Sequence, residues 1–269
     1  SQLNMRIGLF DSGVGGLTVL KKIVELCPNT SFIYLADTAR LPYGIKTSKE
    51  IIQIAKEVSS WFRHQSIDCF LVACNTTNAI ALDVIKNTLD VPVFDLIESV
   101  STTVKEHRVG VIATPSTVNT KAYTNAILNF NPTTFVIEQP CPEFVPMIEI
   151  DNIYSNEITD IAIGYLKPLL NQEIESLILG CSHYPLITPL LMDLLPSNVK
   201  LIDPAEALSL QLKFFMNSKK SYFSRKSSLV DSKFYVTSDP KNFSTKAKRL
   251  LNVFPEVKLI SLRKKGCVS

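Results

Sequence analysis

The sequence lacks the features of membrane proteins, disulfide-rich secreted proteins and polybasic nucleic-acid-binding proteins. No apolar run approaches the roughly 18 to 20 residues that a membrane-spanning helix requires. The six cysteines include no Cys-x-x-Cys pair, so neither a disulfide scaffold nor a common zinc motif is expected. The 28 basic and 25 acidic residues leave a net charge of +3, too small by itself to indicate a nucleic-acid or membrane surface.

The remaining composition is typical of a globular protein of the cytoplasm. Hydrophobic residues make up 46% of the 269 residues and charged residues 20%, a balance that argues against disorder. Residues 1–6 lack the charged start and apolar stretch of a signal peptide. The basic stretch at residues 217–232 is expected to be a solvated loop rather than a nucleic-acid site. We therefore expect a cytoplasmic protein with a small-molecule partner and no nucleic-acid or membrane partner.

Short, β-rich apolar segments alternate with amphipathic helical segments along most of the chain. Thr47 and Glu50 have the spacing of a capping box and predict the start of one helix. Uninterrupted apolar strands that alternate with helices predict parallel sheets covered on both faces. Such sheets hold ligands at the carboxyl ends of their strands. The predicted strands cover residues 6–10, 31–36, 69–73, 91–95, 108–113, 133–137, 176–179, 199–203, 233–237 and 257–260.

A weak internal repeat predicts two similar lobes. Three short segments recur in the same order and at nearly constant spacing: 7–12 with 109–114, 71–76 with 178–183, and 93–98 with 201–206. We expect an α/β protein with two doubly wound lobes, largely parallel sheets, a pseudo-twofold axis between the lobes and an active site in the cleft. The first lobe is expected to comprise residues 1–97 and 207–269, and the second residues 98–206.

Cys74 and Cys181 occupy equivalent places in this repeat. Each ends a predicted strand, precedes polar residues and opens a predicted helix. A helix N-terminus favours the thiolate and lowers the pKa of a thiol, so each cysteine is a candidate base or nucleophile. If the two lobes face each other, the two cysteines do so as well.

The glycine-rich loop after the first strand carries Asp11 and Ser12. It differs from a dinucleotide-binding loop because Thr18 stands where the third glycine is required. The glycines either let backbone N–H groups approach a small anion or only form a tight turn. Asp11, at the end of its strand, could orient or deprotonate Cys74.

Two further segments carry candidate ligand-binding groups. In the loop at residues 36–44, Tyr43 or the Gly44 N–H could touch a ligand, although a purely structural loop explains the pattern equally well. His183 could polarise Cys181 or bind substrate. A zinc site is the weaker alternative, because its candidate ligands Cys74, Cys141, Cys181 and His183 lack a recognisable spacing.

Four segments together resemble the signature segments of glutamate racemases. The resemblance runs from Ile7 to about Asp239 and has one departure, Ser182, where the family usually has threonine. The hydroxyl is retained at that position. The four segments are Phe10-Asp-Ser-Gly-Val-Gly-Gly-Leu-Thr-Val19, Asp37 with Pro42-Tyr-Gly44, Ala73-Cys-Asn-Thr76, and Leu179-Gly-Cys-Ser-His-Tyr-Pro185.

The resemblance implies a racemase of the aspartate/glutamate superfamily that needs neither a cofactor nor a metal. It implies that glutamate is the substrate and that the product, D-glutamate, is used for peptidoglycan in a bacterial cytoplasm. The catalytic pair maps onto Cys74 and Cys181, with auxiliary groups at Asp11, Asp37, Glu149 and His183. The implied substrate-binding positions are Asp11, Ser12, Tyr43, Gly44, Asn75, Thr76, Ser182 and His183.

Two facing thiols suit the inversion of a carbon centre, because one can remove the Cα proton while the other returns a proton to the opposite face. The motifs contain no lysine that would indicate a pyridoxal Schiff base. Three alternatives stay open at this point. They are a racemase of aspartate or another amino acid, a thiol hydrolase with His183 as its base, and a two-lobed amino-acid-binding protein. The oligomeric state is open, and a homodimer is compatible with the sequence.

Overall fold

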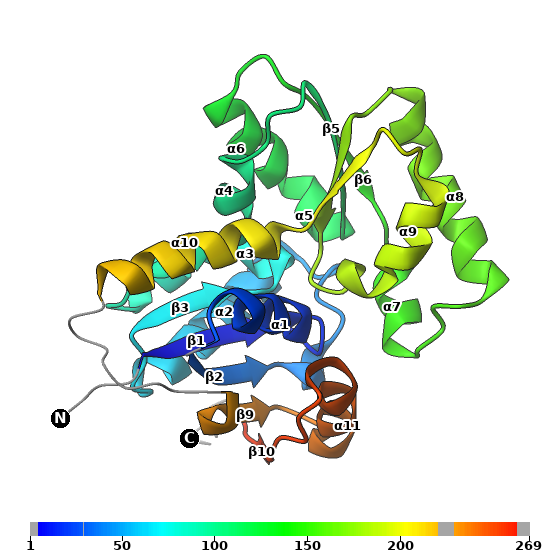
Figure 1. Ribbon diagram of the computed structural model, residues 1–269. Coiled ribbons are helices and arrows are strands. Elements are labelled where there is room, and N and C mark those ends of the chain that lie inside the picture. The colour runs from blue at the N-terminus through cyan, green and yellow to red at the C-terminus, as the bar shows by residue number, and fades with distance from the viewer. Residues whose placement is uncertain (1–4, 29, 220–228, 263–269) are drawn as a thin grey trace.

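The computed structural model describes residues 5–28, 30–219 and 229–262, and its described strands form two parallel sheets (Figure 1). The first sheet has the order β10-β9-β2-β1-β3-β4 and the second β6-β5-β7-β8. The strands are β1 (Arg6–Asp11), β2 (Ser31–Ala36), β3 (Cys69–Val72), β4 (Val93–Asp95), β5 (Arg108–Ala113), β6 (Phe135–Pro140), β7 (Ser176–Gly180), β8 (Lys200–Ile202), β9 (Lys233–Val236) and β10 (Val257–Leu259). The predicted α/β class with two lobes is confirmed.

Helices follow most strands, as expected for right-handed crossovers between parallel neighbours. They are α1 (Gly16–Leu26), α2 (Ser48–Arg63), α3 (Asn75–Thr88), α4 (Leu96–Ser101), α5 (Pro115–Thr120), α6 (Ala122–Phe130), α7 (Phe144–Glu149), α8 (Asn156–Asn171), α9 (Thr188–Leu194), α10 (Pro204–Ser218) and α11 (Pro240–Leu251). Short 3₁₀ turns are η1 (Thr38–Arg40), η2 (Tyr184–Ile187) and η3 (Leu229–Asp231). None of these described helices is long and apolar enough to cross a membrane.

Both faces of the first sheet are covered because alternate residues of each strand point to opposite sides. Ile7 and Leu9 of β1 pack in a core with α1 and α10, whereas Phe10 packs in a second core with α2 and α3. The predicted capping box at the start of α2 is present, with Thr47 accepting from the Glu50 N–H and the Glu50 side chain accepting from Thr47.

The internal repeat corresponds to a repeated sheet topology. The orders β2-β1-β3-β4 and β6-β5-β7-β8 are equivalent strand by strand. The third pair of repeated segments has a local cause. Asp95 ends β4 and Asp203 follows β8, and each caps the next helix, α4 or α10, by accepting backbone N–H groups. The cysteines therefore follow equivalent central strands, β3 and β7.

The C-terminal segment returns to the first sheet. Helix α10 leads from β8 toward this sheet, where it packs against α1, and β9 then pairs with β2 (Figure 1). The Thr38 hydroxyl fixes the return by donating to the Ser238 carbonyl at 2.7 Å. Residues 220–228 of the expected solvated loop lie outside the described residues.

One predicted strand was displaced. The sequence predicted residues 133–137, whereas β6 runs from Phe135 to Pro140. β6 is an edge strand that is nowhere fully buried, and its second half contains Glu138 and Gln139. Its extent is set by pairing with β5 and not by apolar content, so hydrophobicity alone placed it too early.

Candidate active site

The two cysteines that the repeat singled out line one pocket between the sheets. Cys74 is the N-cap residue of α3, and Cys181 follows β7 directly. They are 5% and 7% exposed, so each thiol is largely shielded from water. The pocket is lined by Ser12, Leu41, Tyr43, Gly44, Cys74, Asn75, Thr76, Thr114, Val145, Cys181, Ser182 and His183.

The pocket is narrow, and hydroxyl contacts between the lobes close it. The cavity has a volume of about 20 Å³, which leaves room for one or two waters. Thr76 of α3 and Thr114, at the end of β5, are joined by a 2.8 Å hydrogen bond. Gly44 fits against Thr114 only because it lacks a side chain, since a Cβ there would lie 2.6 Å from the Thr114 Cβ.

Asp11 is fully buried and organises the loop that follows β1. Its Oδ2 accepts the N–H groups of Gly13 and Gly16, at 3.1 and 2.8 Å, and its Oδ1 accepts the Ser182 hydroxyl at 3.1 Å. The hypothesis that these glycines cradle a small anion was wrong for those two N–H groups, because the Asp11 carboxylate occupies them. Burial raises the pKa of Asp11, although these hydrogen bonds and the charge of His183 oppose the rise.

The expected lowering of the Cys74 pKa was also wrong. Burial, followed by the negative charge of Asp11, raises the pKa of the Cys74 thiol to about 12, although the neighbouring Thr77 opposes the rise. The helix N-terminus predicted from sequence is present, but desolvation of a nearly enclosed sulfur outweighs it. Cys74 is therefore a neutral thiol at pH 7 in this state.

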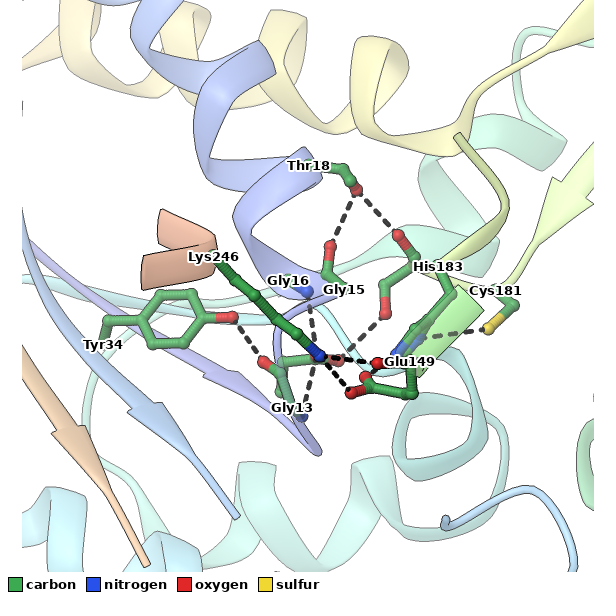
Figure 2. A network of polar contacts seen from close by, with 11 residues as sticks. Gly13, Gly15, Gly16, Thr18, Tyr34, Glu149, Cys181, His183 and Lys246 are labelled. Atoms are coloured by element: carbon green, nitrogen blue, oxygen red, sulfur yellow. Dashed lines mark hydrogen bonds and ion pairs between the residues drawn. The ribbon is translucent and has the colours of Figure 1, made fainter. Parts of the chain in front are cut away.

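Cys181 has a different neighbour, the imidazole of His183. Its Sγ lies 3.9 Å from His183 Nδ1, and His183 Nε2 lies 2.5 Å from Oε1 of Glu149 (Figure 2). Burial alone would lower the pKa of His183, but its hydrogen bonds with Cys181 and Glu149 raise the pKa to about 10. A buried imidazolium therefore faces the Cys181 sulfur.

The His183–Glu149 pair should give the folded protein a defined pH dependence of stability. Its contacts raise the pKa of His183 from 6.5 to about 10 and lower that of Glu149 from 4.5 to about 2. The His183 contribution is complete below pH 6.5 and is lost as the pH rises toward 10. The Glu149 contribution is complete above pH 4.5 and is lost as the pH falls toward 2.

We therefore expect the stability difference between the wild type and Glu149→Gln to be largest between pH 4.5 and 6.5 and to shrink toward pH 10. Urea unfolding of both proteins across this range measures it. A difference that stays constant with pH would show that the pair is not ionised in the folded protein.

Asp37 lies beneath the pocket and does not line it. Its Oδ2 accepts the hydroxyl of Tyr43, which does line the pocket, and the guanidinium of Arg40 at 2.6 Å. Thr237, just after β9, donates to the other carboxylate oxygen at 2.8 Å. Asp37 therefore fixes the position of the Tyr43 side chain through this hydrogen bond. The auxiliary catalytic role of Asp37 stays a prediction.

The other site predictions divide into residues at the pocket and one residue behind it. Ser12, Gly44, Asn75, Thr76 and Ser182 line the pocket, whereas Glu149 reaches it only through His183. The hydroxyl of Tyr123, on α6, donates to the Asn75 side-chain oxygen. Residues 5–28, 30–219 and 229–262 contain no group of three or more His, Cys, Asp or Glu side chains arranged to hold a metal ion.

Sequence reasoning missed two polar residues. Thr114 lines the pocket, and the internal repeat could have found it, because Thr114 occupies the position equivalent to Ser12. Lys246 contacts Glu149 from helix α11. It lies in no motif, and no signal in the sequence singled it out.

Comparison with known proteins identifies the family. The Asp/Glu/hydantoin racemase family model matches residues 7–212. The chain is 73% identical to glutamate racemase of Prochlorococcus marinus (strain NATL1A), over 98% of this chain and all of the relative. The chain belongs to the glutamate racemases of this family. A glutamate racemase of Synechococcus sp. (strain CC9605) is 44% identical over 94% of this chain and 96% of the relative.

Solved glutamate racemases share the fold. The structure of the Francisella tularensis enzyme in complex with D-glutamate matches with a TM-score of 0.89 and 36% identity, covering 96% of this chain and 98% of the other. The Thermus thermophilus enzyme in complex with β-chloro-D-alanine matches with a TM-score of 0.85 and 32% identity, covering 97% and 99%. The prediction that this protein is an enzyme of the glutamate racemase class is confirmed.

Proposed function

We propose that this glutamate racemase interconverts L- and D-glutamate with Cys74 and Cys181 as its two bases, without a cofactor. The observation that carries the proposal is that both sulfurs line one pocket, each delivered by the equivalent central strand of its own sheet. A relative named glutamate racemase covers 98% of the chain, and one neighbouring structure contains D-glutamate.

The chemistry needs one proton acceptor and one proton donor on opposite faces of Cα. In one direction a thiolate takes the Cα proton, and the thiol opposite returns a proton to the resulting carbanion, which inverts the centre. One C–H bond breaks as one S–H bond forms on the first cysteine. One S–H bond then breaks on the second cysteine as the new C–H bond forms. In the other direction the two cysteines exchange roles.

The two cysteines start in different states in our proposal. Cys74, with its pKa near 12 and Asp11 beside it, begins as the thiol. We propose that Cys181, whose sulfur lies 3.9 Å from the His183 imidazole, acts as the base in the first half of this cycle. The enzyme in this state is ready for the enantiomer whose Cα proton faces Cys181, and one turnover leaves the protons in the opposite arrangement.

Fixed dipoles replace a cofactor as stabilisers of the developing negative charge. The side chains of Ser12, Asn75, Thr76, Thr114 and Ser182 supply hydroxyl and amide groups around the pocket, and they can bind the amino and carboxylate groups of the substrate. A pocket with room for only one or two waters is too small for glutamate, so substrate entry requires the lobes or the pocket side chains to move apart.

Deuterium labelling tests the two-base proposal. In heavy water, L-glutamate should give D-glutamate that carries deuterium at Cα, while L-glutamate recovered early should carry little. A two-base enzyme has this property because the returned proton comes from a thiol that has exchanged with solvent. Chiral chromatography with mass spectrometry measures both pools.

The outcomes of this experiment separate the alternatives. Equal and rapid labelling of both enantiomers would indicate one shared base and contradict the proposal. Aspartate in place of glutamate tests substrate choice, and faster turnover of aspartate would overturn glutamate as the substrate. Ligand-dependent stabilisation with no change of chirality would instead indicate a binding protein.

The wider role follows from the product. We propose that the D-glutamate supplies peptidoglycan synthesis in a bacterial cytoplasm. We also propose that residues 1–97 with 207–269 form one lobe and residues 98–206 the other, because β9 and β10 pair with the first sheet. Movement between these two units would open the pocket to substrate.

A further inference from the structure

Lys246 reaches the Cys181 side of the pocket from a distant part of the chain. It lies on α11, beside the first sheet, and its side chain is 12% exposed. Its Nζ donates to the Glu149 backbone carbonyl at 2.8 Å and to Glu149 Oε2 at 3.1 Å. Both contacts end on Glu149, the last residue of α7, so one ammonium holds both the main chain and the carboxylate of that residue.

These contacts complete a line of four groups. Glu149 uses Oε2 for Lys246 and Oε1 for His183, whose other ring nitrogen faces Cys181. Figure 2 shows the Lys246 side chain running to Glu149, with His183 between Glu149 and Cys181. Because both carboxylate oxygens are occupied, the carboxylate cannot rotate without losing a charged partner.

We propose that Lys246 is a positioning residue for racemisation, which fixes the Glu149 carboxylate so that His183 stays protonated and directed at Cys181. This inference rests on the proposed two-base function and identifies a residue that supports one of the two bases, Cys181. Cys181 follows a strand of the second sheet, whereas α11 packs against the first sheet. The proposal therefore makes the environment of Cys181 depend on a helix of the other lobe.

The charges around Glu149 explain why a second cation is required there. A half-buried carboxylate beside a single imidazolium can take its proton and leave a neutral pair, so that no charged ring would face Cys181. The charge of Lys246 and its hydrogen bonds help to lower the pKa of Glu149, against the effect of burial. The other titratable groups on this side are Asp11 of β1, Tyr34 of β2 and the surface pair Asp151–Arg249.

The tests compare Lys246→Met with two matched variants. Methionine keeps much of the apolar length of the side chain and removes its charge. Lys246→Arg restores the charge on the same helix. Arg249→Met removes a cation one turn away, whose ion pair with Asp151 is more than half exposed and is not expected to matter.

The first readout does not depend on activity. With the side-chain carboxyl carbons of glutamate ¹³C-labelled, and the Glu149 signal assigned from Glu149→Gln, NMR follows the ionisation of Glu149. In wild type and in Arg249→Met it should titrate well below 4.5. In Lys246→Met it should titrate at higher pH, with recovery in Lys246→Arg. An unchanged titration in Lys246→Met would overturn the inference.

The second readout is kinetic and uses the symmetry of the reaction. L- and D-glutamate have equal free energies, so kcat/KM must be the same in both directions for every variant. We expect Lys246→Met to lower it about 10- to 100-fold in both directions, the scale of a misplaced catalytic group. The effect on Cys181 alone must therefore be read from isotope effects.

Deuterium at Cα distinguishes the two directions. When proton transfer at Cys181 is slowed, the substrate isotope effect on kcat/KM should rise for the enantiomer that Cys181 deprotonates and fall for the other. A lysine that only stabilises the fold would leave both isotope effects as in the wild type. That result, or the same pattern in Arg249→Met, would contradict the inference. Failure of the proposed function would show separately, in wild-type enzyme that does not racemise glutamate.

Discussion

Cys74→Ala and Cys181→Ala are each expected to reduce racemisation of glutamate about 100- to 10,000-fold, the usual contribution of a general acid–base group. Each variant lacks either the acceptor or the donor of the Cα proton, because both sulfurs line the pocket and alanine supplies no group that can replace either. Circular dichroism of the product measures the loss, and unfolding temperatures show whether the fold is intact.

The cysteine variants also make a prediction about proton exchange. Cys74→Ala retains Cys181, which can still remove and return the proton on its own face of Cα. Each single variant should therefore exchange the Cα proton of only one enantiomer with heavy water and should racemise neither. The enantiomer that exchanges in Cys74→Ala should be the opposite of the one that exchanges in Cys181→Ala. Exchange of the same enantiomer by both would contradict the assignment of one cysteine to each face.

The chain offers a matched control for these variants in Cys69. It lies in β3, five residues before Cys74, and is fully buried. Burial raises the pKa of Cys69 above its ordinary value, so it is a packing residue. Cys69→Ala should lower the unfolding temperature and leave kcat nearly unchanged. A loss of activity as large as in Cys74→Ala would mean that packing, and not proton transfer, explains the result.

His183→Gln has the second largest expected effect, a fall in kcat of about 100-fold. The substitution removes the imidazolium 3.9 Å from the Cys181 sulfur and leaves Glu149 paired with Lys246 alone. A glutamine can still hydrogen-bond, but it carries no charge to stabilise a thiolate. The steady-state rate in each direction, measured at neutral pH, tests the size of the effect.

The pH profile of this variant tests the cause. Because the contacts raise the pKa of His183 to about 10, the wild-type imidazolium persists through neutral pH and is lost as the pH approaches 10. Wild-type activity should therefore fall on that side, and this limb should be absent from His183→Gln. His64→Gln, a change on the exposed end of α2, should leave both the rate and the profile unchanged.

Most of the fold could be predicted from the sequence because parallel strands buried on both faces give strong apolar signals. β1 and β2 are almost entirely buried, and the apolar runs placed them to within a residue. The internal repeat worked for a topological reason, since equivalent segments occupy equivalent strands. Apolar content failed to give the bounds of β6, an edge strand whose second half carries polar residues.

The candidate site was predictable where its residues lie next to one another in motifs at strand ends. Asn75, Thr76 and Ser182 adjoin the two cysteines and line the pocket with them. Protonation states were not predictable in this way. The pKa of Cys74 depends on burial and on Asp11, which is remote in sequence, and Lys246 reaches Glu149 across 97 residues of chain.

The late return of the chain to its first sheet has a consequence for biosynthesis. Strand β2 pairs with β1 on one side but acquires its other neighbour, β9, only after the whole second sheet has been made. Until then its free edge is a template for association with other chains. The same late segment brings in Lys246, so a nascent polypeptide can hold both cysteines and still lack the last element behind Cys181. Full activity would then require α11, which is synthesised after the second sheet is complete.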